Sequence, residues 1–208
     1  MEFIPLLEES GLILPVGRWI FRTAAESCAR WQARMPAFMM GINLSNLQLE
    51  DPSFIDFMEQ TLLDSGAAPS GVVVELTESY LASNVEALST YLQRLHNLNV
   101  LVSMDDFGTG YSSLGVLKQY PIDIIKIDRT FVRGIKSSAF DQAFIQFVVD
   151  LCHKLGVGVV LEGVETSEEL DVVAPMNLNY YQGFYFGHPV PPERFEREFL
   201  SRGAPDAG

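Results

Sequence analysis

The sequence predicts an α/β fold, a TIM-like (β/α) barrel in which about six of the eight strands are present. Helical and strand-like segments alternate along the 208 residues, which is typical of parallel sheets with helical crossovers. The strand-like segments are continuous Val, Ile and Met runs, as expected for strands covered by helices. Six of them end in a residue that suits a metal or a phosphate, and such barrels carry their chemistry at the carboxyl ends of their strands. An open doubly wound sheet is the competing fold, but it would gather such residues at a single switch point.

In the first half of the chain, residues 16–33 have apolar side chains at helical spacing and predict the first helix. A second helix begins near Pro52 and stops at Gly66, a residue that commonly ends helices. Short apolar runs predict strands that end at Asn43, span 72–75 and span 100–104. A helix over about 85–95 joins the last two strands and ends before a turn at 97–99.

The second half continues this alternation. Pro121 opens a strand that ends at Lys126, and Gly156 and Gly158 mark the turn into a strand over 157–162. The sixth strand lies near 179–182. The helices predicted here span about 112–119, 139–155, 167–173 and 191–200.

One domain over residues 1–200 accounts for these elements, and the small polar tail 201–208 is predicted to be disordered. A closed barrel of this kind takes eight strands and about 250 residues. The chain opens almost directly into a helix, so the domain is predicted to be truncated at its N-terminus. Two strand edges would then be exposed, and we expect them to recruit a second copy in a homodimer.

Composition limits the partners. The formal net charge of -13 disfavours nucleic-acid polymers and anionic membranes, whereas a small anion remains possible if metal cations neutralise an acidic pocket. No stretch approaches the roughly 20 apolar residues of a membrane span, and no secretory signal is recognisable. Cys28 and Cys152 have neither metal-type nor redox-type spacing, which favours buried, reduced thiols in a cytoplasmic protein.

The strand ends supply a coherent set of polar side chains. If they share one rim of a barrel, four carboxylates, two amides and one lysine converge there. Without His or Cys among them, oxygen ligands point to Mg²⁺ or Mn²⁺ rather than zinc. The residues at the strand ends are Asn43, Glu75, Asp105 with Asp106, Lys126, Glu162 and Gln182.

The densest motif is DDFGTGYSS, which runs from Asp105 to Ser113. Neighbouring side chains on a regular strand point to opposite faces, so the second carboxylate is expected to lie already in the turn. There the two carboxylates can bind two neighbouring cations. Gly108 and Gly110 let the loop pass close to a ligand, and Ser112 or Ser113 can cap the next helix. A capped turn without a ligand is the alternative.

The remaining candidates each have a structural alternative. Asn43 is either a turn amide or a neutral ligand, and Glu78 either pins a loop or caps a turn. Lys126 either forms a buried ion pair or orients a water or phosphate, and Gln182 hydrogen-bonds either a base or ribose or its own backbone. Asp128 is expected to cap the next turn. Three aromatic rings are candidates for stacking on a base or for packing in the core: Phe107, Tyr111 and Phe184.

Together these motifs resemble the EAL-domain family, which hydrolyses the bacterial second messenger cyclic di-GMP to linear pGpG. The similar segments cover about residues 1–200 in family order. They are FIPLLEESGLI (3–13), INLS (42–45), ELTES (75–79), DDFGTGYSSL (from 105), IKIDRTFV (125–132), LEGVET (161–166) and YYQGFYFGHPV (180–190).

The resemblance implies a role for each matching residue. Asn43, Glu75, Asp105 and Asp106 match metal ligands, Glu162 a metal-site acid or general base, and Lys126 a water-orienting cation. Gln182 matches a substrate-side residue. Three residues match positions that hold the DDFGTGYSS loop: Glu78, Thr109 and Gly110. Two divalent cations, Mg²⁺ or Mn²⁺, would bind the scissile phosphate and activate water for in-line attack, with Asp106 and Glu162 among the catalytic groups.

The sequence departs from the family at its front, because the eponymous Glu-Ala-Leu precedes the segment that matches Phe3 and is absent from the printed chain. Its glutamate is a metal ligand, so the resemblance implies weakened turnover in this chain. The alternative function is therefore a cyclic di-GMP receptor or interaction module. Sensory or cyclase domains are expected in the parent protein.

Overall fold

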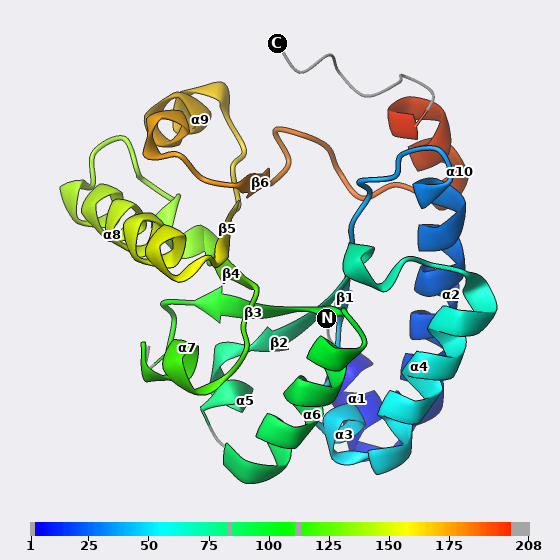
Figure 1. Cartoon of the computed structure of the whole chain (residues 1–208). Coiled ribbons are helices and arrows are strands. Elements are labelled where there is room, and N and C mark those ends of the chain that lie inside the picture. Colours follow the sequence, from blue (N-terminus) through cyan, green and yellow to red (C-terminus); the bar gives the residue numbers. More distant parts are fainter. Residues whose placement is uncertain (1–2, 83–84, 111–113, 201–208) are drawn as a thin grey trace. The chain divides into compact units, whose positions relative to one another are not determined.

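A computed structural model describes residues 3–82, 85–110 and 114–200. Within them, six strands form one sheet in chain order, and every strand pair for which a register is defined is parallel (Figure 1). The predicted α/β class with parallel strands is thereby confirmed. The strands are β1 (Met40–Asn43), β2 (Val72–Thr77), β3 (Leu101–Phe107), β4 (Ile124–Ile127), β5 (Gly158–Glu162) and β6 (Tyr180–Gln182). The predicted tail 201–208, and Tyr111, Ser112 and Ser113, lie outside the described residues.

The chain packs as two compact units. The first comprises Met1–Glu75, Glu86–Leu101 and Val190–Gly208, and the second comprises Leu76–Val85 and Val102–Pro189. Asn43 and Glu75 therefore belong to the first unit, while the other predicted site residues belong to the second.

The first unit is built around two long helices, α2 (Ile13–Gln32) and α4 (Pro52–Ser65), which lie side by side (Figure 1). Phe21 and Phe54 are fully buried between them and meet edge to face, with ring centroids 6.3 Å apart. The ends of α4 follow from its sequence, because Asp51 caps its first turn, Pro52 occupies its first position and Gly66 closes it at φ 72°. The other helices of this unit are α1 (Phe3–Glu9), α3 (Asn46–Glu50), α6 (Val85–Asn97) and α10 (Pro192–Phe195), with a 3₁₀ turn at Pro69–Gly71 and a π turn at Glu196–Leu200.

In the second unit, α8 (Ala139–Leu155) packs its buried face on β5. Ser138 caps its first turn and Gly156 ends it in the left-handed region at φ 72°, which explains why its bounds agree with the sequence prediction. The remaining helices of this unit are α5 (Glu78–Leu81), α7 (Gly115–Gln119) and α9 (Ser167–Val173), with 3₁₀ turns at Arg129–Phe131 and Ala174–Met176.

Both cysteines are buried free thiols, as predicted, and burial raises the pKa of each to about 11. Among the described residues, no helix is both long and apolar enough to cross a membrane.

Candidate active site

In the first unit, the parallel pairing of β1 with β2 sets two of the predicted residues opposite each other. Asn43, the last residue of β1, pairs with Glu75, and β2 continues beyond the predicted end at Glu75 to Thr77. The Glu75 carboxylate lies over Gly41, where an added Cβ would overlap its Oε1 atom. Glycine at position 41 therefore leaves the room that this carboxylate occupies.

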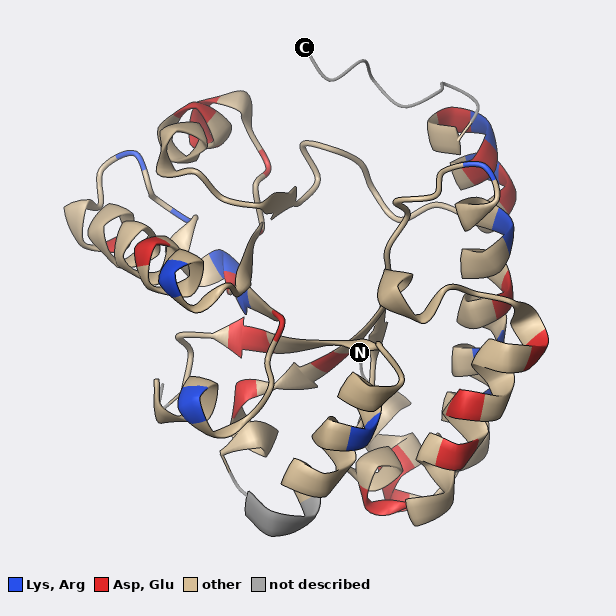
Figure 2. Cartoon of the chain, in the orientation of Figure 1, with Lys and Arg blue, Asp and Glu red and all other residues tan. Residues whose placement is uncertain are grey.

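In the second unit, Lys126 joins two acidic strand ends. Its Nζ atom lies 2.7 Å from Glu162 Oε1 and 3.1 Å from Asp105 Oδ1, and its side chain is only 6% exposed. The three residues come from β3, β4 and β5, which are consecutive in the sheet. Gln182 stands opposite Glu162 in the pairing of β5 with β6. Figure 2 shows acidic positions on β2 and β3 and a basic position on β4.

A β-bulge accounts for the adjacent carboxylates. Met104 pairs with Ile125 and Phe107 with Ile127, so Asp105 and Asp106 together stand opposite the single residue Lys126. Asp106 adopts the left-handed conformation at φ 58°, which Asp tolerates better than most residues. The expectation that the second carboxylate lies beyond the strand is wrong, because β3 continues to Phe107 and the extra residue is taken up within it.

Electrostatics at the bulge favour a bound cation. Partial burial, with the negative charges of Asp105 and Asp128, raises the pKa of Asp106, while Lys126 and Arg129 act in the opposite direction. A cation beside Asp106 would offset this repulsion. Arg129 was not selected from the sequence, although its place directly after the IKID segment was a usable signal.

The loop after the bulge is held from several sides. Buried Glu78 accepts a hydrogen bond from the Gly108 amide at 3.2 Å, and a Cβ added at Gly110 would come into van der Waals contact with the same carboxylate. The Thr109 hydroxyl and amide both donate to the Asp106 carbonyl, at 2.9 and 3.2 Å. The Asp128 carboxylate accepts from the Thr130 amide at 2.9 Å, so it caps the 3₁₀ turn, as expected.

The chemistry of this set fits Mg²⁺ or Mn²⁺, because its donors are carboxylate and amide oxygens. Within the described part of the chain, no three His, Cys, Asp or Glu side chains are gathered as a ready ligand group. The Lys126 ammonium instead balances Asp105 and Glu162.

Two aromatic candidates have different surroundings. Phe107 is 2% exposed and therefore packs in the core, whereas Phe184 is 53% exposed and contacts the His188 ring, with centroids 4.3 Å apart and planes inclined by 32°.

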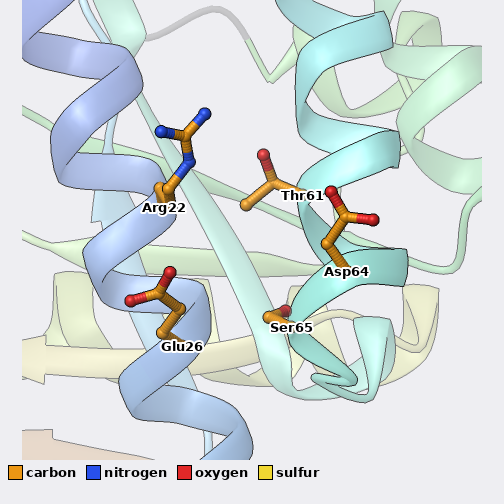
Figure 3. A pocket seen from close by; sticks show the side chains of 5 residues that line it. All are labelled: Arg22, Glu26, Thr61, Asp64 and Ser65. Carbon is orange, nitrogen blue, oxygen red and sulfur yellow. The ribbon is translucent and has the colours of Figure 1, made fainter.

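A hollow of about 220 Å³ lies between α2 and α4 in the first unit. Figure 3 shows its five lining residues, Arg22, Glu26, Thr61, Asp64 and Ser65. None of them is among the residues predicted from the sequence to form the site, and their mixed charges indicate no ligand class.

Comparison with known proteins agrees with the motifs. The family model described as the EAL domain matches residues 1–189. The chain belongs to the EAL domain family. Cyclic di-GMP phosphodiesterase PdeR of Escherichia coli (strain K12) is 37% identical to it over 197 residues, which are 95% of this chain and 30% of PdeR. The chain thus spans less than a third of that relative's length.

Solved EAL structures share the fold. The PaMucR phosphodiesterase in complex with c-di-GMP superposes with a TM-score of 0.87 at 35% identity, covering 93% of this chain and 79% of that one. The calcium and cyclic di-GMP complex of Klebsiella pneumoniae BlrP1 gives a TM-score of 0.75 at 31% identity, covering 85% of this chain and 44% of that one. The predicted TIM-like family of folds is confirmed by these likenesses.

Proposed function

We propose that this chain hydrolyses cyclic di-GMP to linear pGpG in a metal-dependent in-line reaction. The observation that carries the proposal is the cluster of Asp105, Lys126 and Glu162 at consecutive strand ends, with Asp106 brought beside it by the bulge. Membership of the EAL family and the phosphodiesterase activity named for PdeR support the same substrate.

Carboxylate oxygens would hold the divalent cations. In this proposal Asp105 and Asp106 bind from the bulge and Glu162 from the end of β5. Asn43 and Glu75, which pair across β1 and β2, are proposed as further ligands on the strength of their INLS and ELTES motifs. When bound, Mg²⁺ or Mn²⁺ neutralises phosphate oxygens and lowers the pKa of a coordinated water.

Lys126 and Glu162 have distinct proposed roles in the chemical step. The ammonium of Lys126 is fixed by two carboxylates and donates a hydrogen bond to the attacking water or to a phosphate oxygen. Glu162 accepts the proton of the water as its oxygen attacks phosphorus, and the bond from phosphorus to the 3′ oxygen breaks in line. The departing 3′ oxygen takes up a proton, which leaves a 5′ phosphate on pGpG.

The other residues serve the substrate or the loop. Gln182, exposed opposite Glu162, is proposed to hydrogen-bond the nucleotide. Glu78, Thr109 and Gly110 are proposed to keep the backbone after Asp106 in shape through the contacts described above. A homodimer, attached sensory or cyclase domains and a cytoplasmic location stay predictions.

A cyclic di-GMP receptor without turnover is the second candidate. It is favoured by one observation, that the Lys126 ammonium forms ion pairs with both Asp105 and Glu162 and so neutralises part of the charge available to metal ions.

The deciding experiment measures pGpG formation by chromatography with Mg²⁺ or Mn²⁺, beside a calorimetric titration with cyclic di-GMP. Asp105→Asn should reduce turnover about a thousandfold, since the loss of one charged metal ligand costs several kcal/mol. Asp150→Asn, an exposed change on α8, is the matched control and should leave turnover unchanged. Tight binding without pGpG would support the receptor, and turnover indifferent to Asp105→Asn would refute the mechanism.

A further inference from the structure

Gly108 stands two residues after Asp106, and two aromatic rings fill the space that a side chain at this position would need. A Cβ added there would lie 2.6 and 2.8 Å from Cε2 and Cζ of Phe131 and 3.1 Å from Cζ of Phe144. The Gly108 backbone is also in the left-handed region, at φ 95°. Only glycine therefore combines this conformation with so close an approach of the rings.

These rings cannot swing aside freely, because they are stacked on each other. Phe131 and Phe144 have centroids 4.3 Å apart and planes inclined by 15°. Phe144 also lies between Phe107 and Phe140, with centroids 6.3 and 6.4 Å away. The stack joins α8, the 3₁₀ turn at Arg129–Phe131 and the last residue of β3, so Phe144 is in contact with three other rings and Phe131 packs on it.

Gly108 is thus held by two kinds of contact. Its amide donates to the buried carboxylate of Glu78, while the rings of Phe131 and Phe144 occupy the space where a side chain would lie. The rings limit how far the Gly108 backbone can move toward them, in addition to the hydrogen bonds that Glu78 and Thr109 make with this turn.

We propose that Phe131 and Phe144 are positioning residues that act through Gly108 to hold the Asp106 carboxylate for cation binding. Phe131 lies in the IKIDRTFV segment but has no assigned role there, Phe144 lies in none of the similar segments, and both would otherwise count as ordinary packing. The inference rests on the proposed function, since it takes Asp106 as a metal ligand.

The test measures Mn²⁺ affinity of the full chain by electron paramagnetic resonance. Phe131→Leu and Phe144→Leu remove the ring edges and should each weaken Mn²⁺ binding about tenfold, as loss of a group that supports a ligand typically does. Phe147→Leu is the matched control, because it makes the same change on α8 at a side chain that is 53% exposed. Its Mn²⁺ affinity should equal that of the unaltered chain.

A double-variant cycle separates positioning from lost stability. Gly108→Ala should weaken Mn²⁺ binding because its methyl group meets the Phe131 ring, and adding Phe131→Leu should restore part of the affinity by making room. Hydrogen exchange without metal supplies a second readout: the Gly108 amide should exchange faster in Phe131→Leu than in Phe147→Leu.

The outcomes separate the positioning role of the two rings from the proposed function. Leu variants that melt earlier but bind Mn²⁺ as the unaltered chain does would overturn the positioning role while leaving the proposed function intact. Additive effects of Gly108→Ala and Phe131→Leu would also overturn it. An unaltered chain that binds no Mn²⁺ would overturn the proposed function, and the inference with it.

Discussion

Replacing Lys126 by Met removes one ammonium and keeps a side chain of similar length in a site that is almost closed to water. The change leaves Asp105 and Glu162 without the cation that now lies 3.1 and 2.7 Å from them. Their side chains are 15% and 18% exposed, so water can replace only part of what they lose.

The expected cost follows from these exposures. Breaking a fully buried ion pair by removing one partner costs about 3–5 kcal/mol. The partial exposure of both carboxylates places the expected loss below that range, at about 2–3 kcal/mol. For a chain of this size, this corresponds to a fall in Tm of about 5–10 °C.

Thermal unfolding with and without Mn²⁺ checks the reasoning. In the absence of metal, Lys126→Met should have a lower Tm than the unaltered chain. Mn²⁺ should raise the Tm of the variant by at least as much as it raises that of the unaltered chain, because the metal ion then neutralises the two carboxylates. Cyclic di-GMP turnover should nevertheless fall by about 10²–10⁴-fold, the range of a lost proton-transfer or orienting group. Lys154→Met, an exposed change on α8, is the control. A metal-free Lys126→Met variant as stable as the control would refute the ion-pair account.

Two further predictions concern parts of the chain outside the site. Ser53 and Arg18 hydrogen-bond the Asp51 carboxylate and lower its pKa, so Asp51→Ala should cost about 1 kcal/mol at neutral pH. Because the pKa of Asp51 is lower in the folded chain than in the unfolded chain, the stability cost of Asp51→Ala should shrink as pH falls through the folded pKa. Denaturant unfolding at several pH values measures this cost. A cost that stays constant with pH would contradict the prediction. Cys28 and Cys152, with pKa values raised to about 11, should react with a thiol reagent at pH 8 only in denaturant, and prompt labelling of the folded chain would contradict their burial.

The sequence predicted best those helices whose two ends are marked by characteristic capping or helix-ending residues. Helix α8 has a capping Ser138 and a left-handed Gly156, and helix α4 has Pro52 and Gly66, so their ends could be read from single residues. Helix α1 was not predicted, because it buries none of its residues and its apolar side chains therefore show no clear core-facing pattern.

At the site, the residue types were predictable but their arrangement was not. The alternation of side chains along a strand predicted that Asp105 and Asp106 point in opposite directions. Only the pairing of β3 with β4 reveals that the two residues form a bulge. The ion pairs of Lys126 were one of two alternatives that the sequence left open. The rings around Gly108 come from residues far along the chain, and no local pattern indicates such a contact.

The most direct test of the central claim is anomalous diffraction from a crystal of the chain soaked in Mn²⁺ with cyclic di-GMP. We expect anomalous peaks within about 2.2 Å of carboxylate oxygens of Asp105 and Asp106, the distance typical of small divalent cations. Occupied crystals in which no peak touches either carboxylate would contradict the claim that these residues hold the catalytic metals.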